Sequence, residues 1–179
     1  MVGTIYIGCS QPDLPADQDL PNLSKEALTK GIVAPDFTLI SYPIQPGASQ
    51  NKVSLRDFEG TPIILNFWAG SCPPCRAEMP DFQALHEDSS DQLSIIGIDV
   101  GQFSGLGTPE QAEELISEVG ITYRTGYALS PDIMKDYKVI SMPTTIFIDA
   151  NGSIVREWSG MIDRDTLFDL GRTLISTGQ

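Results

Sequence analysis

The stretch IILNFWAGSCPPC, residues 63–75, decides the fold of this chain. Residues 63–68 form an almost continuous apolar run, which predicts a central strand covered on both faces. Apolar side chains then recur at helical spacing, at Cys75, Met79, Phe82 and Leu85. Cys72 and Cys75 therefore lie where a buried strand gives way to the first turn of a helix.

Two cysteines at that place predict redox chemistry. A pair three residues apart can close a small disulfide or open to a dithiol with little backbone movement. The N-terminus of a helix also stabilises negative charge, so the leading thiol should ionise more readily than a free cysteine.

The remaining pattern predicts an α/β architecture, a central mixed sheet flanked by helices. Strands are expected at 37–41 and 93–100, a hairpin at 144–158 with its turn at 150–152, and a last helix from residue 163. Thr108-Pro109-Glu110-Gln111 predicts a capped helix start, and Ser130-Pro131-Asp132 a shorter helix reaching about Tyr137. Residues 101–107, rich in glycine, are expected to form a flexible connection.

Composition limits the classes of partner. The chain has 179 residues, of which 41% are hydrophobic, enough for one substantial core. Its formal net charge of −13 would repel a phosphate backbone or an anionic membrane surface, so nucleic acid is not an expected partner.

Four ordered motifs carry a family resemblance: APDFTL at 34–39, LRDFEG at 55–60, LNFWAGSCPPCRAEMP at 65–80, and Met142-Pro143-Thr144-Thr145. Together they resemble the TlpA/ResA-like thioredoxin family of extracytoplasmic thiol-disulfide oxidoreductases. The resemblance implies a thioredoxin-like domain at 32–179, preceded by an N-terminal tail or tether at 1–31. It also implies protein substrates bearing disulfides or thiols, an upstream membrane thiol electron donor, no cofactor, and a role in cytochrome c maturation.

The same resemblance proposes roles for individual residues. Cys72, nearer to solvent at the helix tip, would be the attacking thiolate, and Cys75, on the buried stripe, the resolving thiol. Met142-Pro143 would be a cis peptide facing the pair and binding an extended substrate.

Three residues depart from this or the wider thioredoxin pattern. Ser71 stands where many relatives have Trp, and Gln102 where some carry a Glu near the pair. Asn66 replaces the buried Asp of thioredoxins, as is usual in this family. Proton transfer to Cys75 is then left to water, Asp99 or Glu78, although Glu78 is expected to be an exposed or salt-bridged helix residue.

The N-terminus suggests a lipid anchor. Residues 1–9 read MVGTIYIGC, and a polar, Pro-containing tract follows. An apolar stub ending in Gly8-Cys9 resembles the end of a bacterial lipoprotein signal, in which Cys9 would carry lipid. The alternative is an incidental cysteine in a flexible tail.

The sequence leaves other functions open. Copper or zinc binding through the cysteine pair is one alternative, although the single histidine, His86, would lie about 16 Å further along the helix and is expected to be exposed. A peroxiredoxin-like antioxidant enzyme is another, because such proteins share the APDFTL segment. A purely structural disulfide is a third, and a loop this short would stabilise the fold little.

Overall fold

The computed structural model describes residues 31–44 and 49–177. The proposed tail at 1–31, Cys9 included, lies almost wholly outside the described residues, so the boundary at residue 31 stays a prediction.

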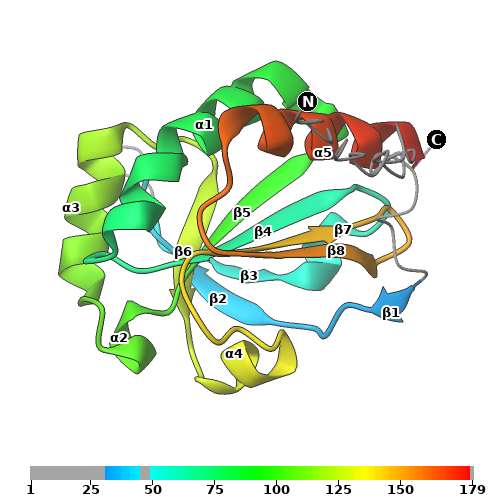
Figure 1. Cartoon of the computed structure of the whole chain (residues 1–179). Helices are drawn as coiled ribbons and strands as arrows, with labels where there is room; N and C mark the ends of the chain where they lie inside the picture. Colours follow the sequence, from blue (N-terminus) through cyan, green and yellow to red (C-terminus); the bar gives the residue numbers. More distant parts are fainter. Residues whose placement is uncertain (1–30, 45–48, 178–179) are drawn as a thin grey trace, which may run out of the picture.

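One mixed sheet organises the molecule (Figure 1). Its strands are β1 (Ile32–Val33), β2 (Thr38–Ser41), β3 (Lys52–Ser54), β4 (Ile63–Trp68), β5 (Ser94–Asp99), β6 (Arg124–Ala128), β7 (Thr144–Ile148) and β8 (Ser153–Ser159). They are ordered β1-β8-β7-β4-β5-β6-β2-β3. β4 pairs in parallel with β5, and β5 with β6, while the other neighbours run antiparallel.

Helices cover both faces of the sheet (Figure 1). The α-helices are α1 (Pro73–Ser89), α2 (Gly101–Ser104), α3 (Pro109–Val119), α4 (Asp132–Asp136) and α5 (Arg164–Thr177). Short 3₁₀ turns occupy Leu55–Phe58 and Ser90–Gln92. Side chains of α1, α3 and α5 pack in one core cluster, and α4 contributes to the cluster on the other face. The predicted α/β fold with a helix-flanked mixed sheet is confirmed.

Strand β4 lies at the centre and divides the two cores. Ile63, Leu65 and Phe67 belong to the cluster on the α4 side. Ile64 and Trp68 belong to the cluster beneath α1. Because side chains alternate along a strand, Asn66 shares the α1 face with Ile64 and Trp68.

The expected helix starts and strands are largely observed. Thr108 caps α3, with reciprocal bonds between Thr108 and Gln111, and Gly120 ends it in the left-handed conformation at φ 75°. The segment expected to be a flexible connection instead contains α2, and strands β1, β3 and β6 were not expected.

Candidate active site

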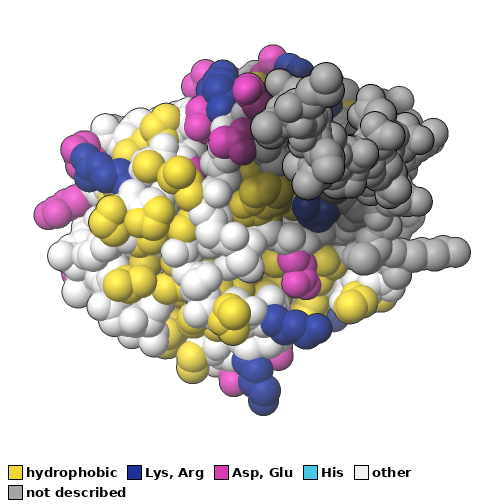
Figure 2. Space-filling view, viewed as in Figure 1, with side chains coloured by type: hydrophobic (Ala, Val, Ile, Leu, Met, Phe, Trp, Pro, Cys, Tyr) yellow, Lys and Arg dark blue, Asp and Glu magenta, His cyan; other side chains and the backbone are white. Residues whose placement is uncertain are grey.

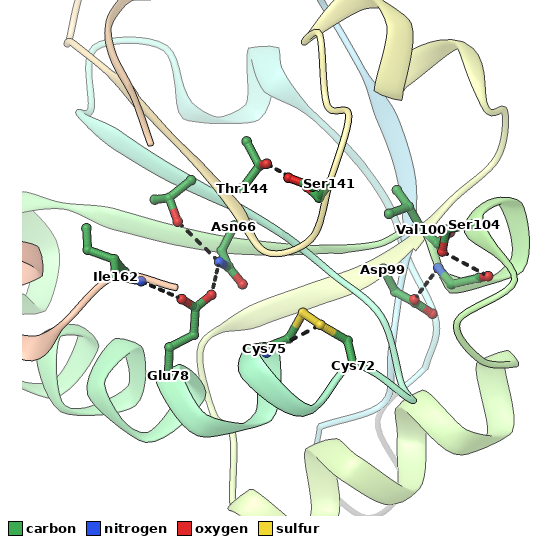
Figure 3. The surroundings of a disulfide bond; sticks show 12 residues. Asn66, Cys72, Cys75, Glu78, Asp99, Val100, Ser104, Ser141, Thr144 and Ile162 are labelled. Carbon is green, nitrogen blue, oxygen red and sulfur yellow. Dashed lines mark hydrogen bonds between the residues drawn. A yellow bond between two sulfur atoms is a disulfide. The ribbon is translucent and has the colours of Figure 1, made fainter. Parts of the chain in front are cut away.

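The cysteine pair lies at the first turn of α1, directly after β4 (Figure 3). Cys72 and Cys75 form a disulfide with their Cα atoms 5.3 Å apart. The Cys75 amide donates a hydrogen bond to Cys72 Sγ at 3.3 Å. Cys72 is 4% exposed and Cys75 is fully buried, so Cys72 is the more accessible of the two sulfurs.

The local sequence explains this arrangement. Pro73 and Pro74 carry no amide hydrogen, so Cys75 supplies the first free donor of the helix, and that donor is directed at Cys72. The turn before Cys72 packs tightly against α3: a Cβ at Gly70 would lie 2.8 Å from the Ala112 nitrogen. Only glycine allows the loop to approach that closely.

A second loop lies at the same end of the sheet. Thr144, which begins β7, pairs with Phe67 near the end of β4, so residues 141–143 are held beside the cysteine turn. The Met142–Pro143 peptide bond is cis, as expected. Met142 packs against the cluster that contains Cys72 and Cys75, and the Pro143 carbonyl accepts a hydrogen bond from the Gly160 amide at 2.8 Å. Thus the structure brings Met142 and Pro143 together with the cysteines.

Glu78 is where the sequence-based prediction was wrong. It is 1% exposed, not at the surface, and forms no salt bridge in the described chain. Its carboxylate accepts hydrogen bonds from Asn66 Nδ2 at 2.7 Å and from the Ile162 amide at 3.0 Å (Figure 3). Burial raises the pKa of Glu78 to about 7, against an ordinary value of 4.5. A buried carboxyl group therefore lies one helical turn beyond Cys75.

A signal for Glu78 was present in the sequence. Positions 75, 78, 82 and 85 are spaced three, four and three residues apart, so Glu78 lies on the same stripe as Cys75, Phe82 and Leu85. A charged residue on an apolar stripe is normally placed at its border. Two hydrogen-bond donors from distant segments make its burial possible here.

The other polar residues considered for the site form hydrogen bonds with groups other than the cysteines. Asp99 is 2% exposed, and its carboxylate accepts bonds from the Tyr42 hydroxyl at 2.6 Å and the Gly101 amide at 2.8 Å. Burial raises its pKa, and these two bonds oppose that rise. Gln102 donates to the Ala128 carbonyl at 2.7 Å, and exposed Ser71 donates to Gln111 at 3.3 Å.

The metal alternative gains no support from the described residues. Within residues 31–44 and 49–177, no group of three or more His, Cys, Asp or Glu side chains is placed to hold a metal ion. His86 is half-buried rather than exposed, with its ring edge against Tyr123 at 6.3 Å between centroids.

In the same ranges, none of the helices has the length and apolar character needed to cross a bilayer.

Comparison with known proteins places the chain in a family. The profile of the AhpC/TSA family matches residues 31–157. The chain belongs to the AhpC/TSA family. Thiol-disulfide oxidoreductase ResA of Oceanobacillus iheyensis is 35% identical over 137 residues, which are 76% of this chain and 68% of that protein. Thiol:disulfide interchange protein HelX of Rhodobacter capsulatus is 30% identical over 167 residues, covering 93% of this chain and 84% of HelX.

Solved structures agree on the fold. A thiol:disulfide interchange protein DsbE from Chlorobium tepidum superposes with a TM-score of 0.69 at 24% identity, covering 85% of this chain and 99% of that one. The predicted resemblance to ResA-like thioredoxins and the thioredoxin-like fold are both confirmed. The protein is a thiol-disulfide oxidoreductase with a close cysteine pair, and proteins bearing thiols or disulfides are its class of substrate.

Proposed function

We propose that Cys72 and Cys75 exchange their disulfide with cysteines of extracytoplasmic proteins, with reduction of substrates for cytochrome c maturation as the cellular role. The observation that carries the exchange is the asymmetry of the pair: Cys72, at a helix N-terminus, is 4% exposed, and Cys75 is fully buried. An accessible sulfur can meet a substrate, while a buried one can react only with its neighbour.

In the reducing direction the exchange takes two steps. The Cys72 thiolate attacks one sulfur of a substrate disulfide, and the other substrate sulfur leaves as a thiolate. Cys75, once deprotonated, attacks Cys72 Sγ, which closes the Cys72–Cys75 disulfide and releases the second substrate sulfur. The enzyme dithiol is oxidised by two electrons, and the substrate disulfide is reduced by the same two.

Glu78 is the proposed acceptor of the Cys75 proton. A general base works best when its pKa lies near the working pH, and burial brings Glu78 to about 7. Asp99 is less suited because it is the last residue of β5, bonded to Tyr42 and Gly101, whereas Glu78 lies one helical turn beyond Cys75 on the same buried face of α1.

The proposed docking site for the substrate chain is the loop at Met142 and Pro143. Next to it, Ile140 is 91% exposed, and Met161, on the loop that Gly160 joins to Pro143, is 56% exposed. Figure 2 shows hydrophobic side chains among uncharged ones on one face of the molecule, with charged side chains both within that face and at its rim. Apolar side chains flanking a substrate cysteine would bury this exposed area.

We also propose that the protein works outside the cytoplasm, tethered through a lipid on Cys9 and re-reduced by a membrane thiol donor. This rests on the family resemblance and on the Gly8-Cys9 sequence. Mass spectrometry of the protein purified from membranes of its own cells would detect a diacylglyceryl group on Cys9. A Cys9→Ala variant that remains in the membrane fraction would contradict the lipid tether.

Trapping the mixed disulfide tests the exchange. In Cys75→Ser, Cys72 should attack the disulfide of a substrate protein and remain joined to it as a mixed disulfide. The complex should accumulate because the resolving thiol is missing. Cys72→Ser, the matched control, should trap nothing. Absence of the complex, together with failure of the wild type to reduce the same substrate, would refute the proposal.

The same preparations separate the alternatives. Consumption of hydrogen peroxide with Cys72 converted to sulfenic acid would indicate the peroxiredoxin-like activity. Stoichiometric retention of copper or zinc by the reduced pair, lost in both serine variants, would indicate metal binding.

A further inference from the structure

Asn66 has a buried oxygen with no hydrogen-bond partner. The residue is fully buried, yet its Oδ1 accepts no hydrogen bond in the structure. Leaving a buried carbonyl unpaired is costly, so such an atom calls for an explanation. Asn66 also interrupts the apolar run of β4, where a hydrophobic side chain would avoid this cost.

Its amide group is held in one orientation. Nδ2 donates to Glu78 Oε1 at 2.7 Å and to Thr145 Oγ1 at 3.3 Å. An ionised carboxylate can only accept, so the nitrogen faces Glu78 and the oxygen points the other way. Figure 3 shows Oδ1 directed to the side of the Glu78 carboxylate on which the disulfide lies. Cys75 is one turn before Glu78 on the same buried face of α1.

The disulfide has no hydrogen-bond donor for this oxygen, but the dithiol has S–H groups that can donate. When a donor dithiol reduces the pair, the donor becomes a disulfide, and Cys72 and Cys75 take up two electrons and two protons. Cys75, which is fully buried, then carries an S–H group. A thiol is a weak donor, and the open acceptor on its side of Glu78 is Asn66 Oδ1.

We propose that Asn66 Oδ1 accepts a hydrogen bond from the Cys75 thiol in the reduced enzyme, and that this bond favours the dithiol over the disulfide. Asn66 then acts as a positioning residue that holds the Cys75 proton beside Glu78, since the same amide bonds the thiol through Oδ1 and the carboxylate through Nδ2. This inference rests on the proposed exchange at Cys72 and Cys75.

The S–H stretching band in the infrared spectrum tests the bond without any substrate. In a Cys9→Ala, Cys72→Ser background, Cys75 is the only thiol of the chain's three cysteines. The band should lie at lower frequency when Asn66 is present and shift upwards in Asn66→Leu, which has similar volume but no acceptor. An unchanged band would overturn the proposal.

Thr145→Val is the matched control. It removes the other partner of the Asn66 amide but leaves Oδ1 and the Glu78 bond in place. It should leave the S–H band where it is. A shift as large as that of Asn66→Leu would assign the effect to packing and overturn the proposal.

A second measurement covers the case in which Asn66→Leu does not fold. In a crystal structure of the reduced wild-type protein, Cys75 Sγ should lie within hydrogen-bonding distance of Asn66 Oδ1. A Cys75 sulfur turned to a main-chain carbonyl instead would contradict the bond.

The redox equilibrium shows the consequence for the enzyme. Against glutathione at fixed pH, Asn66→Leu should shift the pair about fivefold towards the disulfide, the effect of one net hydrogen bond, or about 20 mV. A shift towards the dithiol would refute the proposed bond. Failure of the trapping experiment would instead refute protein disulfide exchange and leave the S–H measurement valid, so the two failures are distinguishable.

Discussion

At the scale of single residues, Glu78 has the clearest consequence for stability. Its pKa is about 7 in the folded protein and 4.5 as an ordinary value, so the folded state holds the proton more tightly than the unfolded state. The free-energy cost of ionising Glu78 in the folded protein is absent below about pH 4.5 and complete above about pH 7. The free energy of unfolding should therefore fall by up to about 3 kcal/mol as the pH rises through this window.

Glu78→Gln should lose that fall, as measured by urea unfolding at a series of pH values. Glu87→Gln, which changes an exposed carboxylate on the same helix, is the control and should retain it. An identical pH dependence in the wild type and Glu78→Gln would show that burial does not perturb this group.

The two cysteines should differ in reactivity because their burial differs. In the reduced protein, Cys72 should react with iodoacetamide about tenfold faster than Cys75, since it is the more accessible of the two and receives the Cys75 amide bond. Mass spectrometry of tryptic peptides from single-cysteine variants measures both rates. In urea the two rates should converge; faster alkylation of Cys75 in the folded protein would reverse the assigned roles.

At the scale of elements, α3 depends on its capping box. Thr108 Oγ1 accepts from the Gln111 amide at 3.4 Å, and Gln111 Oε1 accepts from the Thr108 amide at 3.0 Å. Thr108→Ala should lower the free energy of unfolding by about 1 kcal/mol. Thr108→Ser keeps the hydroxyl and should lose much less; equal losses would show that the methyl group, rather than the cap, carries the effect.

Elements with strong local signals were predictable, and those defined by partners were not. The apolar run of β4 and the cap of α3 are properties of neighbouring residues, so the sequence indicates them directly. β6, RTGYA, has a glycine and no simple alternation, and it becomes a strand by pairing with β5 and β2. At Gly126 in β6, a Cβ would lie 2.3 Å from the Ile40 carbonyl oxygen, a constraint visible only after the strands are paired.

At the scale of the whole molecule, the site combines predictable and unpredictable parts. The cysteine turn follows from local sequence, while the role of the Met142–Pro143 loop came from family resemblance. The sequence shows Glu78 on the apolar stripe of α1 but not the partners that allow its burial, because one donor, Ile162, is 84 residues away, and the other, Asn66, reaches it from a neighbouring layer. A buried charge depends on partners that the fold assembles.

Net charge acts at this same scale and leads to a prediction about substrates. A charge of −13 attracts cationic chains over a distance of about 10 Å at 0.1 M salt. Two disulfide peptides that share the residues beside the cysteine but end in lysines or glutamates form a matched pair. Mixed-disulfide formation with Cys75→Ser should be faster for the lysine peptide, by about tenfold at low ionic strength. Stopped-flow kinetics should show this ratio shrinking as salt rises, because screening removes the long-range attraction while the contacts around Cys72 remain. A ratio independent of salt would place the preference in those contacts instead.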